Sequence, residues 1–452
     1  MQHESAKKIM KKQISVAKFG GISVATMAAI YKCVDIVKNN EDIKVVVVSA
    51  QAGVTNLLEK LIKSDIYGYK KIFKDLHLII DPIVESVLPA ESSNVENLFS
   101  ELEEFCQRLY ISQELDLRLQ SQILSFGERV SAYIFNQVLR EQGINCEHID
   151  ARKIIKADGG YIEAKPLLEN IKNQARKYLS DSEKIYVMGG FIGSNLDNET
   201  ILLGRGGSDY SAALIAEAIN ANMLYIWTDV AGIHQADPRL IPKSRVIRQI
   251  NFEEAIELIS FGAKVLHPDT LWPVIRSGTK VFVGSTFDPD KGGTYIVDNQ
   301  ELVNRDGVRA ITEKHEQILM KIKLQDRDIS DVAPDIFSLL KKYGVTPVIV
   351  SLSDKEFSFV INRLDKFIEN SVISDLTALH LDCFEFERNL SLTALIGNGL
   401  DKIPQLFKDL SDRLGISSSK LVGYGAKGNS LYFLTESDNT LLQRVYDEIF
   451  KN

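Results

Sequence analysis

The chain has 452 residues, of which 45% are hydrophobic and 25% charged. This composition is typical of a globular protein and excludes a fibrous or mainly disordered one. Lysine and arginine number 53 against 61 aspartates and glutamates, so the formal net charge is −8. A net acidic chain lacks the concentrated cationic surface of a general nucleic-acid binder. At about 150 residues per domain, the length predicts roughly three domains.

Targeting and membrane segments are not indicated. The most continuous aliphatic stretch surrounds residues 45–48, far short of the roughly 20 apolar residues that a spanning helix needs. The N-terminal residues are polar where a secretory signal has an apolar core. The four cysteines are far apart, without a CxxC or Cys/His cluster, so neither a zinc site nor a disulfide framework is predicted. We therefore expect a cytoplasmic protein with free thiols and no membrane or nucleic-acid partner.

The N-terminal half alternates strand and helix patterns. A strand is predicted at residues 14–19, a helix through residue 37, and a buried strand at 43–49, where a β-branched run is too hydrophobic to face water on either side. Further strands are predicted at 185–188, 223–227 and 280–283, and helices at 94–109, 113–142, 208–220 and 252–261. A strand–helix–strand beginning predicts an α/β layered fold.

The character of the sequence changes after the turn signal KGGT at residues 291–294. Two smaller units follow, each with the order strand–helix–strand–strand–helix, which indicates an internal duplication. Their strands are predicted at 318–324, 346–352 and 356–361, then at 390–396, 419–424 and 430–435. Helices are predicted at 333–343, 403–414 and 438–450. Neither unit carries a catalytic constellation.

Two glycine-rich motifs indicate anion binding. Lys18 and Phe19 precede Gly20 and Gly21 at the end of the first predicted strand, where a helix N-terminus offers N–H groups and Lys18 offers a charge suited to phosphate. The second motif, GRGGSD at residues 204–209, precedes an alanine-rich helix. Its glycines favour a nest of N–H groups and its arginine suits a carboxylate, while Ser208 or Asp209 could cap the helix. The alternative is that Asp209 is only an N-cap.

Three further motifs are individually weak. TDVAGI at residues 228–233, followed by DPR, ends a buried strand, where open α/β sheets bind ligands. GAKVLHP at 262–268 contains Lys264, which could meet a nucleotide, and His267, which we interpret as a packed turn residue. SAQAGVTN at 49–56 also ends a buried strand, and a Gly-Glu pair at 127–128 interrupts a helical region. A lone acid such as Glu128 is more often a surface residue.

Taken in order, these motifs resemble the amino-acid kinase family and, within it, the aspartate kinases of the monofunctional, lysine-sensitive type. The family pattern is KFGGTSVA, SAxAGxTN, GE, GRGGSDxxA, TDVxGIxxxDPR and GAKVLHP, and all six pieces occur here in that order over about 250 residues. The resemblance continues into VFVGSTFDPDKGGT and VGYGAKGNSLYF, so it extends over nearly the whole chain.

The resemblance implies an amino-acid-kinase-type three-layer α/β/α sandwich followed by two ferredoxin-like ACT α+β domains. The implied bounds are a catalytic domain at 12–298 and ACT domains at 310–384 and 385–452. The implied reaction is phosphoryl transfer from ATP, with Mg²⁺, to the β-carboxylate of L-aspartate. This gives 4-phospho-L-aspartate, the first step toward lysine, threonine, methionine and diaminopimelate. An amino-acid effector at the ACT domains and a homodimer are also implied.

The resemblance also assigns residues to roles. Lys18 and Asp209 are implied to be catalytic, and the substrate-binding residues to be Thr55, Glu128, Arg205 and Ser208. Arg205 would take the α-carboxylate of the substrate and Glu128 its ammonium. The implied nucleotide contacts are Lys18, Phe19, Gly20, Gly21, Thr228, Asp229, His234, Arg239, Lys264 and Val265.

Three positions depart from the family pattern. Ile22 replaces a threonine beside the phosphate loop, although Ser23 remains, and His234 replaces a tyrosine. Val348 replaces an acid in the segment that resembles the lysine-binding part of the ACT pair, where Ser353 and Asp354 match loosely. A valine cannot offset the charge of a lysine ligand. We therefore expect lysine inhibition to be weak or absent, or another effector to bind.

Three alternatives remain at this point. The chain could be a related kinase for glutamate, acetylglutamate, carbamate or UMP, which the Arg205 and Glu128 pair and the ACT tail disfavour. It could be a non-catalytic ACT-type sensor, although Lys18, Asp209 and Glu128 are all present. A nicotinamide-dependent Rossmann enzyme would need GxGxxG after the first strand, which the sequence lacks.

Overall fold

The computed structural model describes residues 13–451 except 66, 88–91, 113–115, 264–265, 303–305, 325–326, 382, 404 and 417–418. The chain forms two compact units. The first unit comprises Met1–Ile233, Val246–Phe252 and Val265–Leu302, and the second comprises His234–Arg245, Glu253–Lys264 and Val303–Asn452. Within the described residues, no helix is long and apolar enough to cross a membrane.

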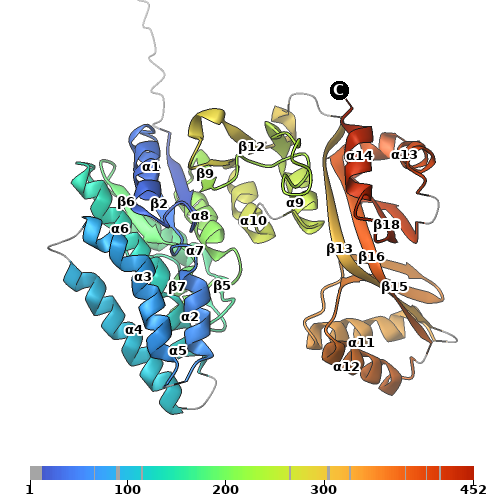
Figure 1. The fold of residues 1–452 in the computed structure, drawn as a ribbon, viewed down its shortest axis with the longest axis horizontal. Helices are drawn as coiled ribbons and strands as arrows, with labels where there is room; N and C mark the ends of the chain where they lie inside the picture. Colours follow the sequence, from blue (N-terminus) through green and yellow to red (C-terminus); the bar gives the residue numbers. More distant parts are fainter. Residues whose placement is uncertain are drawn as a thin grey trace, which may run out of the picture. The chain divides into compact units, whose positions relative to one another are not determined.

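The first unit is built on an eight-stranded sheet with the order β10-β12-β11-β9-β1-β2-β6-β3. Figure 1 labels its strands β2, β6, β9 and β12. Its strands pair in parallel except where β11 meets β12. The strand bounds are β1 Ser15–Phe19, β2 Ile43–Val48, β3 Cys146–His148, β6 Ile185–Gly189, β9 Met223–Thr228, β10 Gln249–Asn251, β11 Lys280–Ser285 and β12 Gly293–Val297. The small pairs β4 (Ala157–Asp158) with β5 (Lys165–Pro166) and β7 (Ile192–Ser194) with β8 (Thr200–Leu202) are antiparallel.

Helices cover both faces of this sheet, which is why its central strands are hydrophobic on both sides. On one face, Phe19 of β1 and Val46 and Val48 of β2 share a core with apolar residues of α1 to α6. On the other face, α8 contacts β1, β2 and β9, and α7 and α10 pack on α8. The helix bounds are α1 Met27–Lys38, α2 Val54–Ile62, α3 Tyr69–Val87, α4 Ser92–Ser112, α5 Leu117–Leu124, α6 Phe126–Glu141, α7 Leu168–Tyr178, α8 Gly207–Ala218 and α10 Pro268–Ser277. The predicted three-layer α/β/α sandwich is confirmed.

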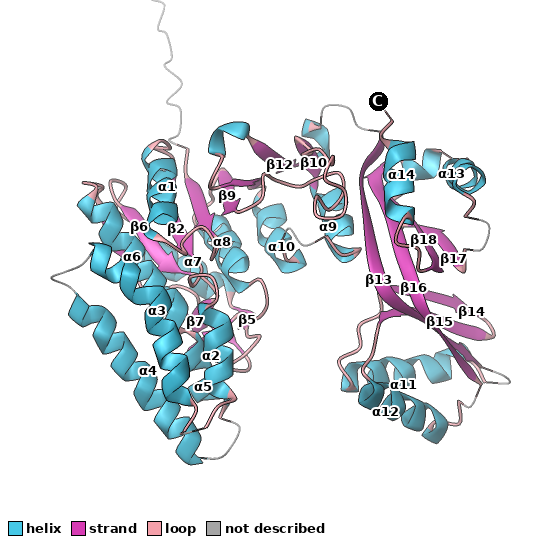
Figure 2. Cartoon of the chain, in the orientation of Figure 1, coloured by secondary structure: helices cyan, strands magenta, loops and turns pink. Residues whose placement is uncertain are grey.

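The second unit contains a six-stranded antiparallel sheet with the order β14-β15-β13-β16-β18-β17 (Figure 2). Its strands are β13 Gly307–Lys323, β14 Ile349–Ser353, β15 Glu356–Asn362, β16 Phe384–Asn398, β17 Leu421–Tyr424 and β18 Ser430–Glu436. Its helices are α9 Phe252–Ser260, α11 Ile329–Lys342, α12 Lys366–Ala378, α13 Leu406–Leu414 and α14 Leu441–Ile449. This mixed sheet and helix arrangement confirms the predicted ACT-type α+β region.

The long strands β13 and β16 connect the two halves of this sheet. Their register shifts near Glu316, which has a φ of 54°, and Asn389 has a φ of 57°. One core lies among β13, β15, α11 and α12, and another among β16, β18, α13 and α14. Because both long strands run through both halves, the predicted boundary at 384/385 stays a prediction.

Two segments that follow β9 belong to the second unit. Ala236 and Ile241 lie in the same core as Tyr446 of α14, and the Ile311 N–H donates to the Gln235 carbonyl at 2.6 Å. In α9, the buried Glu254 pairs with Arg309 at 2.8 Å. The resemblance places these segments within residues 12–298, and that bound stays a prediction.

Some predicted elements differ in detail. The helix predicted at 113–142 is divided into α5 and α6 at Ser125, and the Gly127-Glu128 pair lies in the first turn of α6. The pair therefore begins a helix and does not interrupt one. The KGGT turn is confined to Lys291 and Gly292, because β12 begins at Gly293.

Candidate active site

Six of the predicted catalytic and substrate-binding residues line one cavity of the first unit, with a volume of about 540 Å³. These residues are Lys18, Thr55, Glu128, Arg205, Ser208 and Asp209. They come from the end of β1, the start of α2, the first turn of α6 and the loop and first turn of α8. The carboxyl ends of parallel strands therefore meet helix N-termini here, as open α/β sheets arrange a ligand site.

Lys18 and Asp209, which both line this cavity, form an ion pair. Lys18 Nζ lies 2.6 Å from Asp209 Oδ1, and both side chains are largely buried. Among the described residues, the helix α8 has Gly206 as its N-cap and no side chain that caps it. The expectation that Ser208 or Asp209 caps the helix is therefore wrong, because Asp209 lies inside the first turn and pairs with the lysine.

The N-terminus of α8 is suited to an anion. Gly206 has a φ of 70°, and an added Cβ there would lie 2.4 Å from the Cβ of His267. Glycine at this position therefore permits both the left-handed backbone and the close approach. The helix dipole and the first-turn N–H groups favour negative charge at this end, beside the Lys18 ammonium.

Glu128 is the most strongly perturbed acid of the cavity. It is 3% exposed, and burial raises its pKa to about 7, although the backbone N–H groups of Ala50 and of Glu128 itself and the charge of Lys18 oppose this rise. Its Oε2 has no hydrogen-bond partner among the described residues. The surface position expected for a lone acid is wrong. A cation that enters the cavity would find a desolvated carboxylate ready to pair with it.

Close packing around Ala50 holds the cavity together. A Cβ on Gly21 would lie 2.7 Å from the Ala50 carbonyl oxygen, and one on Gly127 would lie 2.6 Å from the Ala50 Cβ. Glycine at both positions lets the loops after β1 and β2 and the first turn of α6 touch. The sequence motifs at Gly21 and Gly127 thus position Lys18 and Glu128 relative to the same loop.

Arg205 and Thr55 lie at more open parts of the wall. Arg205 is exposed and makes no ion pair or hydrogen bond with the described part of the chain. Its guanidinium is therefore available for a carboxylate ligand. Thr55 lies in the first turn of α2, which begins after Gly53 with a φ of 90°.

The predicted nucleotide residues of the first unit are positioned by the sheet. The Phe19 side chain is fully buried and stacks on Phe135 at 5.6 Å, so a nucleotide could meet only its backbone. The Gly20 N–H donates to the Trp227 carbonyl at 3.0 Å. Thr228 and Asp229 follow the neighbouring strand β9, and the Thr228 hydroxyl donates to Asp229 at 3.0 Å.

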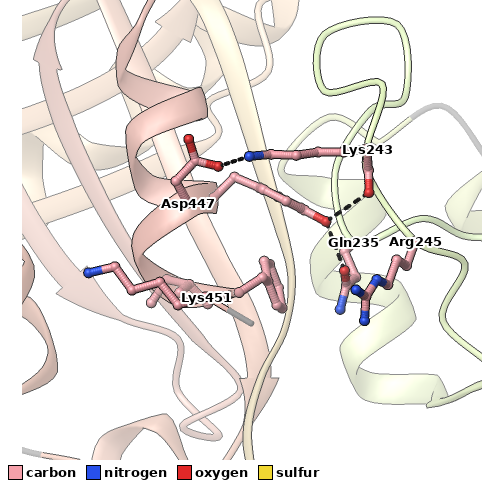
Figure 3. A pocket seen from close by; sticks show the side chains of 8 residues that line it. Gln235, Lys243, Arg245, Asp447 and Lys451 are labelled. Atoms are coloured by element: carbon pink, nitrogen blue, oxygen red, sulfur yellow. Dashed lines mark hydrogen bonds and ion pairs between the residues drawn. The ribbon is translucent and has the colours of Figure 1, made fainter.

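His234 and Arg239 belong to the second unit. His234 Nδ1 lies 3.2 Å from the Ser244 carbonyl oxygen, and Arg239 pairs with Asp237 at 2.6 Å. Their segment is attached to α14, because the Tyr446 hydroxyl donates to Gln235 at 3.0 Å and Lys243 pairs with Asp447 (Figure 3). These contacts border a crevice of about 510 Å³.

The remaining predicted nucleotide residues, Lys264 and Val265, lie outside the described residues. Near them, His267 is the N-cap of α10, and its side chain accepts from the Asp269 N–H. Its interpretation as a packed turn residue agrees with this position.

The departures from the family pattern have distinct surroundings. Ile22 is 48% exposed, whereas Ser23 is fully buried with its hydroxyl 2.7 Å from that of Thr286. Ser23 is therefore engaged in the core and does not replace the hydroxyl missing at residue 22. In the second unit, Val348 is half-buried, and its N–H donates to the Val360 carbonyl at 2.7 Å.

Sequence reasoning assigned no role to several residues of the cavity wall. Gln51, Glu163 and Phe191 line the cavity, and Phe191 has a φ of 64°. An added Cβ on Gly207 would lie 2.6 Å from the Phe191 ring, so these two residues are in close contact. Two sequence features could have indicated two of these residues. Gly189 and Gly190 directly precede Phe191, and Gln51 lies within the SAQAG motif at a position to which no role was given.

The cavity does not present a preformed metal centre. Across the described ranges, no group of three or more histidine, cysteine, aspartate or glutamate residues is placed to hold a metal ion. A Mg²⁺ ion that enters on ATP phosphates needs only one or two protein carboxylates, and Asp209 lies next to the proposed phosphate-binding helix end. The residues present therefore fit a metal that arrives with the nucleotide.

The cavity thus combines a buried lysine, a helix N-terminus and two opposite charges on an α/β/α sandwich. Residues 13–285 match the model of the amino acid kinase family, which is more than half of the chain. The chain therefore belongs to the amino acid kinase family.

Relatives narrow this assignment. Lysine-sensitive aspartokinase 3 of Escherichia coli is 32% identical over 456 residues, which cover 97% of this chain and 100% of the relative. An aspartokinase of Chlamydia pneumoniae is 32% identical over 442 residues, which cover 96% of each chain. The crystal structure of E. coli aspartokinase III with aspartate and ADP matches with a TM-score of 0.85 and 31% identity, over 97% of this chain and 100% of that one. Within the amino acid kinase family, the chain belongs to the aspartokinases.

Proposed function

We propose that this enzyme transfers the γ-phosphoryl group of ATP to the side-chain carboxylate of L-aspartate and that the cavity around Lys18 and Glu128 is where it does so. The observation that carries the proposal is the gathering of Glu128, Arg205 and the Lys18–Asp209 pair on one cavity. An amino acid has an ammonium and a carboxylate, and the cavity offers one buried acid and one unpaired arginine. The product, 4-phospho-L-aspartate, is the first intermediate toward lysine, threonine, methionine and diaminopimelate.

The residues of the cavity divide the work between substrate and phosphate. Glu128 pairs with the substrate ammonium and Arg205 with its α-carboxylate, while Thr55 and Ser208 add hydrogen bonds. Lys18 and the N–H groups at the start of α8 neutralise charge on the transferred phosphoryl group. Asp209 holds Lys18 in place through the 2.6 Å ion pair. Phosphoryl transfer depends mainly on such positioning and charge neutralisation.

No general base is required for this acceptor, because a carboxylate is already deprotonated at neutral pH. One carboxylate oxygen forms the new bond to phosphorus while the bond from that phosphorus to the β,γ-bridging oxygen breaks and ADP leaves. Mg²⁺, bound with the nucleotide, supplies additional neutralisation of the phosphate charges. Asp209 is the carboxylate that we expect nearest to it.

The nucleotide is proposed to contact Gly20 and Gly21 and the backbone of Phe19, with Thr228 and Asp229 on the adjacent strand end. His234, Arg239, Lys264 and Val265 are assigned to the nucleotide through the family motif alone. The register of β1 with β9, which pairs Phe19 with Trp227, supports the first group.

Regulation, assembly and location are proposed at a coarser level. We propose that an amino-acid effector binds the second unit and that the chain forms a homodimer. The exposed edge strands β14 and β17 support pairing with a second copy. Within the described residues the cysteines form no disulfide, which supports a reducing cytoplasmic location.

The test is trapping of the acyl phosphate with hydroxylamine, with ATP, Mg²⁺ and L-aspartate as reactants. We expect a signal with aspartate that is absent with glutamate and acetylglutamate as acceptors. A folded, ATP-binding protein that gives no signal with aspartate would overturn the proposal. A signal with another acceptor, and none with aspartate, would mean that the cavity binds that other acceptor as its substrate.

A further inference from the structure

Gln51 is a polar residue of the cavity to which no role has been assigned. It lines the cavity together with Lys18 and Glu128, and its side chain is only 1% exposed. Both its Nε2 and its Oε1 are without a hydrogen-bond partner among the described residues. A buried amide in a folded protein is normally satisfied, because an unmade hydrogen bond in the interior is destabilising. The donor and the acceptor group of this amide are therefore both unused within the described residues.

The backbone places Gln51 between the two ends of the proposed substrate site. The N–H of Ala50, the preceding residue, donates to the Glu128 carboxylate. The N–H of Ala52, the following residue, donates to the Gly21 carbonyl at 3.1 Å. The Gln51 carbonyl itself accepts from Val54 at 3.0 Å, which fixes the turn into α2. Gln51 thus lies between the acid that takes the ammonium and the loop that takes the phosphates.

The family pattern does not account for this residue, since SAxAGxTN leaves its position open. The chemistry of the reaction does suggest a role. Glu128 serves the ammonium, Arg205 the α-carboxylate, and Lys18 with the end of α8 the phosphoryl group. The acceptor carboxylate is then the one charged group of aspartate for which no particular residue has been named, since Thr55 and Ser208 are assigned to the substrate without a stated group.

We propose that the Gln51 amide donates a hydrogen bond from Nε2 to the side-chain carboxylate of the bound substrate. This inference rests on the function proposed above. The oxygen held by Gln51 becomes the carbonyl oxygen of the acyl phosphate, and the other oxygen attacks phosphorus as ADP leaves. A neutral donor orients the carboxylate, whereas a second cation there would withdraw the electron density that the attack requires.

The experiment compares Gln51→Met with wild-type enzyme. Methionine is similar in length and has no hydrogen-bond donor, so it fills the same volume. We expect kcat/KM for aspartate to fall about 10- to 100-fold, which is the range for losing a hydrogen bond to a charged group. We expect KM for ATP to stay within about twofold and the thermal unfolding midpoint to be equal or higher, because a buried unpaired amide has been removed.

A matched control is Gln137→Met. Gln137 is also a buried glutamine, but its Nε2 donates to the Tyr133 hydroxyl at 3.0 Å and it does not line the cavity. This control should lower the unfolding midpoint and leave kcat/KM for aspartate unchanged. A second variant, Gln51→Glu, places a negative charge against the acceptor carboxylate and should lower kcat/KM at least as far as methionine does.

The outcomes separate this inference from the proposed function. If wild-type enzyme forms no aspartyl phosphate, the proposed function itself fails. If wild-type enzyme is active and both Gln51 variants keep wild-type kcat/KM, Gln51 does not touch the substrate. A parallel loss of ATP affinity and of thermal stability would assign Gln51 to the structure of the loop and overturn the proposal.

Discussion

The buried carboxylate of Glu128 predicts a variant that is more stable and less active than the natural enzyme. Burial raises the pKa of Glu128 from 4.5 to about 7. The folded protein therefore holds this proton to higher pH than the unfolded chain does. The stabilisation is fully present below pH 4.5 and is lost as the pH rises through 7. Above that pH the ionised carboxylate destabilises the free enzyme by about 3 kcal/mol, at 1.36 kcal/mol per pKa unit.

Glu128→Gln removes the charge and keeps the shape of the side chain. At pH 8 we expect the free energy of unfolding to rise by about 3 kcal/mol, and at pH 5 by less than about 1 kcal/mol. For the catalytic region of residues 13–285, 3 kcal/mol corresponds to a shift of about 5 °C in the unfolding midpoint. The assay is thermal unfolding of both proteins at the two pH values, without ligand.

The same variant should also bind and use aspartate less well. Removing one partner of a buried charge pair costs about 2–5 kcal/mol, so kcat/KM for aspartate should fall by at least about 30-fold. Saturating aspartate should then stabilise wild-type enzyme but not the variant. An equal midpoint shift at pH 5 and pH 8 would refute the raised pKa, and a wild-type kcat/KM would remove Glu128 from the ammonium site.

Three further predictions concern Glu128, Lys18 and Val348. Because only ionised Glu128 pairs with an ammonium, kcat/KM for aspartate should fall about tenfold per pH unit below pH 7 and level off above it; a pH–rate profile that is flat between pH 5.5 and 7 would contradict this. Lys18→Ala should lower kcat about 10²- to 10³-fold, since its partner is the phosphoryl group, and a change in the aspartate KM alone would show that Lys18 serves another group. L-Lysine should inhibit weakly, because Val348 offers no charge to its ammonium, and Val348→Asp should tighten inhibition about tenfold or more in an inhibitor titration; tight inhibition of the wild-type enzyme would disprove the assignment of residue 348.

The fold could be predicted well where local sequence determines structure. The β-branched run of β2 and the alanine-rich α8 have no polar face, and such segments are stable only between other layers. The short strands β3, β10 and β12 were missed because three to five residues carry little periodicity. The attachment of His234–Arg245 to α14 depends on partners about 200 residues away, such as Gln235 and Tyr446, which no local pattern reveals.

The motifs predicted which residues form the candidate site. They did not predict the burial of Glu128 or the unpaired amide of Gln51. Six motif residues from four separate segments line one cavity, as the family resemblance implied. The burial of Glu128 could not be inferred, because it depends on the close contact of Gly127 with Ala50 across two elements. Gln51 was passed over for a related reason. A motif records which residues recur, whereas an unpaired amide is a property of the three-dimensional surroundings.

With the role proposed for Glu128, the raised pKa of its carboxyl group offers a physical basis for selecting a zwitterion. An ionised buried carboxylate with one oxygen left without a hydrogen bond is unfavourable in the free enzyme, so a ligand that brings an ammonium would restore part of what burial removed. A ligand with a carboxylate but no ammonium, such as acetylglutamate, would satisfy Arg205 and leave Glu128 unpaired or protonated. If Glu128 and Arg205 have the proposed roles, discrimination against such a ligand would arise from an unmet charge inside the protein, which is a larger effect than a missing contact at the surface. The burial of Glu128 thus lowers the stability of the free enzyme and, in the proposed role, raises its specificity for an ammonium. Gly127 permits this burial, because a side chain at position 127 would clash with Ala50.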